Sequence, residues 1–333
     1  MLASVLLMVN LDTLKLDAQL VADKTAAAIE RTFWDPKRKL YIEAVDKPQP
    51  AYNWGVGVML SALNATNNQA RIDEWWPVMQ SYWQPEGPVQ GYDVLPMPKS
   101  PDRYYDDNAW MAIALFDAGK KYWGIQATRY ALSGLDDKLG GGVYWREKEK
   151  SSKNTCSNSP TAYAAYRAWH LTTDRGFRYR AEAILNWTLK HLMDPEDHLM
   201  WDNIRLNGEV EKTKWSYNTA LTIRCLAESE RLGFKHEVTA RQMWDSAWKH
   251  WKVKSGIACE GKFAHLLVEA GLTEGFLTDS DKRFVIDLLK RHGEKTGWLF
   301  GNRWDRLPGP KHKPALIDAA SALRVAGLLA KNS

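Results

Sequence analysis

The stretch Tyr104–Gly119, YYDDNAWMAIALFDAG, joins two features in one segment. A polar and aromatic cluster, Tyr104–Asn108, is followed by an alanine-rich run that is apolar nearly all round. A helix that is apolar on every side is normally buried between neighbouring elements. The stretch therefore predicts a buried helix whose first turn carries polar side chains.

The same pattern recurs at intervals of 44–61 residues along the chain, which indicates a repeating architecture. These apolar helices are expected to begin near Tyr52, Tyr104, Asn154, Trp215, Cys259 and His312. Between them lie segments in which charged residues fill one side and apolar residues recur at three and four positions. These amphipathic helices are expected over Leu20–Phe33, Gln69–Trp83, Lys120–Leu135, Asp174–Met193, Glu237–Trp251 and Asp279–Arg291.

Six buried and six amphipathic helices predict an all-α (α/α)6 barrel, in which an inner ring is surrounded by an outer one. We expect residues 1–333 to form a single catalytic domain. Strand signals are sparse, and only Gly140–Glu147 (GGGVYWRE) and Lys39–Glu43 are expected to form minor β-hairpin loops at the rim. A helical solenoid would share the alternation of helices, but it would not gather unusual residues at one end of one helix class.

The composition argues against two classes of partner. Lysine and arginine number 45 against 40 acids, and they are scattered, whereas nucleic-acid binding needs a concentrated basic surface. No segment approaches the roughly 20 apolar residues that span a bilayer. The apolar Met1–Val9 lacks a basic region and a cleavage-like end, so the sequence leaves the compartment open. We expect a monomer that binds neither nucleic acid nor membrane.

The aromatic content points to carbohydrate instead. The chain has 17 tryptophans, and an indole offers a flat apolar face that stacks well on a sugar ring. The eight histidines show no HExxH spacing and the three cysteines are far apart, so no metal, cofactor or disulfide framework is expected. An oligo- or polysaccharide is the expected substrate.

The inner helices of such a barrel are parallel, so their N-terminal ends meet at one rim, where we expect a single cleft. The candidate substrate-binding residues at these helix starts are Asn53, Trp54, Tyr105, Asn108, Trp215, Tyr217 and Asn218. Three loop residues, Asp93, Arg303 and His312, are expected to bind sugar hydroxyl groups, and Trp304 is expected to stack on a sugar.

Asp106 and Asp107 are the candidate catalytic residues. Aspartates favour helix N-termini for purely structural reasons, but two buried carboxylates side by side are costly unless they are used. Neighbours on a helix place their carboxyl groups about 5–6 Å apart, which matches a retaining glycosidase and is too short for an inverting one. Repulsion would also raise one pKa and so distinguish an acid from a nucleophile. By contrast, Asp136 and Asp137 precede a glycine-rich turn and are expected to be solvated.

Four blocks resemble glycoside hydrolase family 76, the endo-acting α-1,6-mannanases and related transglycosylases. They occur in the family's order and are Tyr104–Trp110, Gly140–Glu147 followed by Lys153–Trp169, Trp215–Leu221 and His312–Gly327. The resemblance implies an (α/α)6 barrel and a retaining hydrolase for α-mannosidic linkages, with α-1,6-mannan as the expected substrate. It also implies that Asp106 is the nucleophile and Asp107 the general acid/base, and that Trp215, Tyr217 and Asn218 line the cleft.

Two other functions remain open for this sequence. An unsaturated-uronide hydrolase or a sugar epimerase would use the same barrel, although these enzymes depend on a lone aspartate or on paired histidines. A catalytically silent glycan-binding protein would keep the aromatic residues and use the two aspartates only as helix caps.

Overall fold

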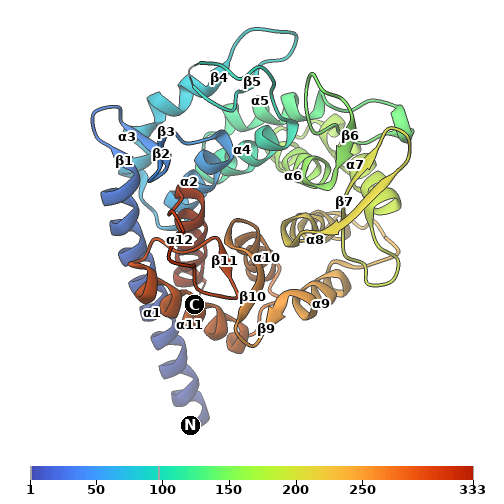
Figure 1. Cartoon of the computed structure of the whole chain (residues 1–333). Helices are drawn as coiled ribbons and strands as arrows, with labels where there is room; N and C mark the ends of the chain where they lie inside the picture. Colours follow the sequence, from blue (N-terminus) through green and yellow to red (C-terminus); the bar gives the residue numbers. More distant parts are fainter. Residues whose placement is uncertain (1, 97, 333) are drawn as a thin grey trace. The chain divides into compact units, whose positions relative to one another are not determined.

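The computed structural model of the chain describes the backbone of residues 2–96 and 98–332, with side chains from Thr13 onward. Within these ranges the chain forms twelve α-helices (Figure 1). They are α1 (Leu2–Phe33), α2 (Asn53–Ala65), α3 (Gln69–Met79), α4 (Tyr105–Asp117), α5 (Lys121–Leu132), α6 (Thr155–Thr172), α7 (Arg175–Leu192), α8 (Ser216–Arg231), α9 (Ala240–Trp251), α10 (Gly261–Thr273), α11 (Asp279–Thr296) and α12 (Leu316–Lys331).

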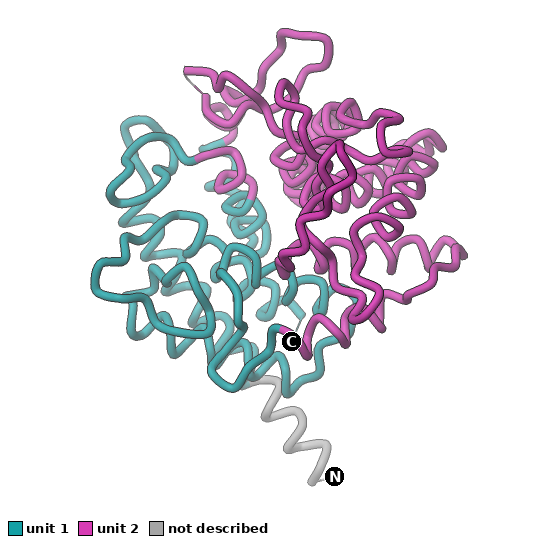
Figure 2. The backbone as a smooth tube through the Cα atoms, turned by 45° about the vertical axis from the view of Figure 1, so that its right-hand side comes forward, with its two compact units in different colours: residues 1–51, 58–75, 251–333 teal, residues 52–57, 76–250 magenta. Residues whose placement is uncertain are grey.

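The chain divides into two compact units, coloured separately in Figure 2. Unit 1 comprises Met1–Ala51, Val58–Trp75 and Trp251–Ser333, and unit 2 comprises Tyr52–Gly57 and Trp76–His250. Each unit is built from helices packed on helices. In unit 2, α4, α6 and α8 follow one another side by side, and α5 and α7 pack against them (Figure 1). In unit 1, α10, α11 and α1 all pack against α12.

The predicted alternation of buried and amphipathic helices is confirmed. Every residue of α8 from Asn218 to Ser229 is buried, whereas α7 buries Phe177, Ala181, Ile184, Leu185, Thr188 and Leu192 along one face. Small residues allow the helices to approach closely. A Cβ atom added to Gly124 of α5 would lie 2.6 Å from the ring of Phe116 in α4, so a larger residue there would push the two helices apart.

Short antiparallel strands connect the helices. The described residues form three three-stranded sheets and one two-stranded sheet. The strands are β1 (Trp34–Asp35), β2 (Leu40–Ala44), β3 (Lys47–Pro50), β4 (Trp83–Gln84), β5 (Gly91–Tyr92), β6 (Ser152–Asn154), β7 (Trp201–Arg205), β8 (Val210–Lys214), β9 (Lys252–Val253), β10 (Gly256–Glu260) and β11 (Arg303–Trp304).

The expected hairpin at Gly140–Glu147 is wrong in detail. This segment leaves a short 3-10 turn, Lys138–Gly140, and makes only isolated bridges, including one between Tyr104 and Arg146. Three glycines with positive φ, Gly140, Gly141 and Gly142, turn the chain too sharply for a regular strand. In the described part of the chain, no helix has the length and apolar content needed to cross a membrane.

Candidate active site

The start of α4 carries Asp106 and Asp107 in its first turn. Tyr104 occupies the N-cap position in an extended conformation, and no side chain caps the helix there. The two aspartates therefore do not serve as the N-cap residue, although both gain from the positive end of the helix dipole. One carboxylate oxygen of Asp106 accepts a hydrogen bond from the backbone N–H of Asp107, at 2.9 Å.

The second carboxylate oxygen of Asp106, Oδ2, is held by two side chains from other parts of unit 2. The indole Nε1 of Trp145 donates to it at 3.0 Å, and the thiol of Cys156, in the first turn of α6, donates at 3.5 Å. Burial raises the pKa of Asp106 to about 6, and these hydrogen bonds, which favour the anion, limit the rise.

The carboxyl group of Asp107 has a different environment. Among the residues described, no donor makes a hydrogen bond to its side chain, and only its backbone carbonyl is engaged, by Asn53 Nδ2 at 3.5 Å. Burial raises the pKa of Asp107 well above its ordinary value, and the negative charges of Asp106 and Asp93 raise it further. These environments favour the proton on Asp107 and the negative charge on Asp106.

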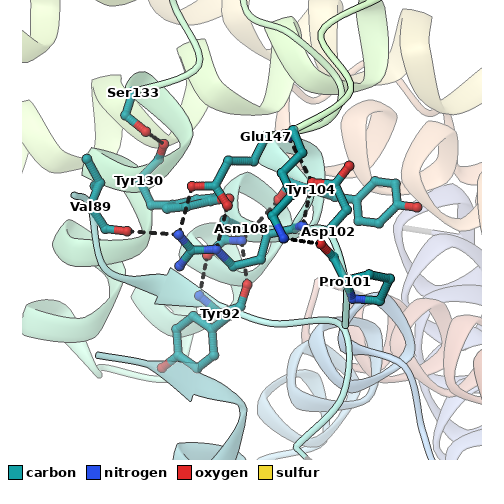
Figure 3. Close-up of polar contacts among 11 residues, drawn as sticks. Val89, Tyr92, Pro101, Asp102, Tyr104, Asn108, Tyr130, Ser133 and Glu147 are labelled. Atoms are coloured by element: carbon teal, nitrogen blue, oxygen red, sulfur yellow. Dashed lines mark hydrogen bonds and ion pairs between the residues drawn. The ribbon is translucent and has the colours of Figure 1, made fainter. Parts of the chain in front are cut away.

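An ion pair fixes the loop that carries Trp145 (Figure 3). Arg103 Nε and Nη2 each donate to the carboxylate of Glu147 at 2.8 Å, and the guanidinium lies 4.5 Å from the centre of the Tyr130 ring. The backbone is joined as well, since Glu147 N donates to the carbonyl of Arg103 at 2.9 Å and Tyr105 N donates to that of Trp145 at 3.0 Å. The segment entering α4 and the loop that follows η2 (Lys138–Gly140) are thus held in register, which places Trp145 beside Asp106.

Two of the predicted substrate-binding residues, Asn108 and Tyr105, hold the start of α4 in place. Asn108 is fully buried, and its amide bonds the backbone N–H and carbonyl of Tyr92 and the carbonyl of Tyr104 (Figure 3). Tyr105 is buried and stacks on Tyr130 with ring centres 5.3 Å apart. Both side chains are used within the protein, so they act on the site by holding the start of α4.

Aromatic rings from three helices gather near the pair. The ring of Tyr217, in α8, lies 6.5 Å from Trp54 in α2 and 6.3 Å from Trp110 in α4. Asn218 follows in α8 and donates to Asp202 at 3.4 Å, while Trp215 occupies the N-cap of the same helix. Unit 2 therefore contains Asn53, Trp54, Asp93, Tyr105, Asn108, Trp215, Tyr217 and Asn218 together with the two aspartates.

Comparison with known proteins decides the family. The model for glycosyl hydrolase family 76 matches residues 18–260, which is well over half of the chain. The chain belongs to glycosyl hydrolase family 76. The predicted resemblance is confirmed, and membership supports a glycoside hydrolase.

Relatives and solved structures agree with the family 76 assignment. A Schizosaccharomyces pombe protein, the meiotically up-regulated gene 191 protein, is 24% identical over 57% of this chain, and the match spans about half (48%) of its length. The family 76 α-mannanase of Bacteroides thetaiotaomicron has a TM-score of 0.81 and 23% identity, over 94% of this chain and 95% of its own. An inactive variant of a Salegentibacter α-1,6-mannanase, with two consecutive aspartates replaced by asparagine, was solved with α-1,6-mannotriose. Its TM-score to this chain is 0.71, at 17% identity, and the match covers 96% of this chain and 100% of that one. These similarities, with the twelve helices, confirm the all-α (α/α)6 fold class.

The other three predicted residues of this family 76 chain lie in unit 1, beyond the matched residues. Trp304 is completely buried in β11, so it offers no face to a sugar, contrary to the expected stacking. Arg303 donates hydrogen bonds from Nε and Nη2 to the two carboxylate oxygens of Asp305, each at 2.7 Å. His312 lies in the turn before α12, half-buried, and its role stays a prediction.

Three residues of the family 76 site were missed from the sequence: Trp145, Cys156 and Asp202. Cys156 is one of the three cysteines from which the sequence predicts no disulfide framework, and Asp202 lies in β7, where no strand was expected. Burial raises the pKa of Asp202, and its charge acts on both Cys156 and Tyr217. In residues 13–96 and 98–332, no three His, Cys, Asp or Glu side chains come together as metal ligands.

Proposed function

We propose that this protein is a retaining glycoside hydrolase of α-mannosidic linkages, with Asp106 as nucleophile and Asp107 as general acid/base. The observation that carries the proposal is the difference between the two carboxyl groups. Asp106 receives hydrogen bonds from Trp145, Cys156 and a backbone N–H, which suit an anion. Asp107 is buried beside that anion without a donor of its own, which suits a carboxylic acid that keeps its proton.

The first step of the proposed reaction forms a covalent ester. A carboxylate oxygen of Asp106 attacks the anomeric carbon while the bond from that carbon to the glycosidic oxygen breaks. Asp107 gives its proton to the departing oxygen, which leaves as a sugar hydroxyl group. The enzyme then holds a glycosyl ester on Asp106 and a carboxylate on Asp107.

The second step reverses the roles. Asp107, now a base, takes a proton from water or from a sugar hydroxyl, and the resulting oxygen attacks the anomeric carbon. The ester bond breaks, and Asp106 returns to its carboxylate form. Two inversions give net retention, which requires the two carboxyl groups to be close together, at about 5–5.5 Å. Their adjacent positions in one helical turn support this requirement.

Two observations support α-1,6-linked mannose as the substrate. The rings of Trp54, Trp110 and Tyr217 provide apolar surface next to the acids, as sugar sites do. The Salegentibacter mannanase, inactivated at two consecutive aspartates, was solved with α-1,6-mannotriose. We further propose endo-type cleavage by a monomer in which residues 1–333 act as one catalytic domain.

The test is incubation with linear α-1,6-mannan, followed by sizing of the products and by proton NMR of the first product formed. We expect progressively shorter oligosaccharides whose new reducing ends appear first as the α-anomer. First appearance of the β-anomer would exclude the retaining mechanism. Calorimetric binding of α-1,6-mannotetraose without any cleavage would favour a silent glycan-binding protein, and loss of the absorbance of a 4,5-unsaturated uronide would favour a uronide hydrolase.

A further inference from the structure

The oxygen Oδ2 of Asp106 accepts from two neutral donors, the indole of Trp145 and the thiol of Cys156. Cys156 is itself a free cysteine that is only 4% exposed. In the described ranges, no lysine, arginine or histidine forms an ion pair with Asp106. The charge on this carboxylate is therefore stabilised by hydrogen bonds and by the positive end of the α4 dipole, without a paired cation.

The direction of the Cys156 hydrogen bond follows from its surroundings. Burial raises the pKa of Cys156 well above its ordinary value, and the charges of Asp106 and Asp202 act in the same direction, so the sulfur keeps its proton. A neutral thiol has one proton to donate, and the carboxylate of Asp106 is the acceptor within reach. The sulfur in turn forms a hydrogen bond with the hydroxyl group of Tyr217, which burial also keeps protonated by raising its pKa.

We propose that Cys156, supported by Tyr217, is a positioning residue that keeps Asp106 ionised and oriented as the nucleophile. The chain runs from the Tyr217 hydroxyl in α8 to the Cys156 thiol in α6 and ends on Asp106 in α4. Linked donors of this kind polarise one another, so each strengthens the next. The proposal rests on the proposed function, because it assigns a role to Asp106 in that reaction.

The other groups around Asp106 explain why such a donor is needed. Asp107 lies beside it on α4, and the charge of Asp202, in β7, acts on Cys156 and Tyr217. The charge of Asp93 acts on Asp107. Burial disfavours ionisation of Asp106, and the hydrogen bonds from Trp145, from Cys156 and from the backbone N–H groups of residues 106 and 107 oppose this effect. Removing one donor must therefore raise the pKa of Asp106.

The first experiment measures kcat/KM for α-1,6-mannotetraose against pH in Cys156→Ala. We expect a loss of about three- to tenfold near neutral pH, the size of one hydrogen bond from a weak thiol donor, with little change in KM. The acidic limb of the profile moves to higher pH, because Asp106 now ionises later. Cys156→Ser keeps a donor and should recover most of the shift.

Cys225→Ala is the matched control, because Cys225 is an equally buried thiol that donates to the carbonyl of Ser159, at 3.1 Å, and not to Asp106. It loses the same volume and should leave the acidic limb in place. A Cys156→Ala profile that coincides with the wild type would overturn the proposal. So would a serine variant that behaves like the alanine variant, since the effect would then be lost packing.

A second measurement needs no substrate. In protein labelled with 15N-tryptophan, the Trp145 indole signal, identified by its absence in Trp145→Phe, should report ionisation of Asp106. Its titration midpoint should move to higher pH in Cys156→Ala and, by less, in Tyr217→Phe. An unchanged midpoint in Cys156→Ala overturns the role of Cys156. If wild-type protein leaves α-1,6-mannan intact while the midpoint moves as expected, the proposed function fails and the positioning of Asp106 by Cys156 stands.

Discussion

The chain contains two Asp-Asp pairs, and unit 2 places them in opposite environments. Asp106 and Asp107 open a buried helix, and burial raises both pKa values. Asp136 and Asp137 lie in the turn after α5, where Asp137 is exposed and Asp136 meets a cation. The same dipeptide is thus a buried pair with raised pKa values in one place, and in the other its first aspartate forms an ion pair that holds the structure.

The difference comes from Lys153, which is completely buried. Its ammonium lies 2.6 Å from Asp136 and also donates to the carbonyls of Lys138 and Gly141. Burial acts to raise the pKa of Asp136, but the hydrogen bonds from Lys153 and Tyr144 outweigh it, and the pKa falls below its ordinary value. No such cation pairs with Asp106 among the described side chains. A buried acid without a cation is costly for folding, which fits the proposed use of the pair on α4 in chemistry.

The largest expected effect is the difference in turnover between substitutions in the two Asp-Asp pairs. Asp106→Asn and Asp107→Asn should each lower turnover of α-1,6-mannan by about 10³-fold or more, since each removes a group that reacts. Asp136→Asn, measured below its unfolding temperature, should keep turnover within a few-fold of the wild type. Circular dichroism checks that all three remain folded. Near-normal turnover in Asp106→Asn or Asp107→Asn would remove that residue from its proposed role.

The next effect is a difference in the free energy of unfolding between substitutions in the two pairs. Asp136→Asn leaves the buried charge of Lys153 without its partner, which should cost about 2–3 kcal/mol; the figure is below that of a fully buried pair because Asp136 is partly exposed. Asp107→Asn removes a buried acid whose ionisation is opposed by burial and by the charge of Asp106, so it should leave stability unchanged or raise it. Urea unfolding at pH 7 measures both. Equal destabilisation by the two substitutions would contradict the contrast drawn between them.

The third effect is the pH dependence of that stability difference. The raised pKa values of Asp106 and Asp107 mean that the folded protein binds these protons more tightly than the unfolded chain. Stability from this pair is therefore present at low pH and is lost as pH rises towards and through about 6. The stability advantage of Asp107→Asn over wild type should grow between pH 5 and pH 8.

Asp136 should behave with the opposite sign. Its pKa is lowered by folding, so its contribution is present above the ordinary aspartate value and is lost as pH falls through the folded value. The deficit of Asp136→Asn should be full at pH 7 and should shrink in acid. Urea unfolding of the wild type and both variants at a series of pH values from 2 to 8 checks both slopes. Parallel curves for the two variants would show that the environments do not differ as described.

The sequence predicted those features that depend on local pattern. The alternation of helix types and the place of Asp106 and Asp107 at a buried helix start follow from periodicity alone. Contacts between distant segments were not predictable in this way. Trp145 and Cys156 reach Asp106 from 39 and 50 residues away, and Trp304 is buried because β11 pairs with β10. Such placements depend on loop paths, which periodicity does not encode.

The smallest expected effect tests how a charge outside α4, on Asp93, changes the pKa of Asp107. Asp93 is buried, and its Oδ1 accepts from the backbone N–H of Ser100 at 2.9 Å, a bond that asparagine can keep. Its negative charge helps to raise the pKa of Asp107. Asp93→Asn should therefore lower that pKa and move the alkaline limb of the kcat/KM profile to lower pH, by less than about one unit. Asp137→Asn, at an exposed position of the other pair, is the control and should leave the profile in place. An alkaline limb that stays fixed in Asp93→Asn would mean that burial and Asp106 alone keep the proton on Asp107.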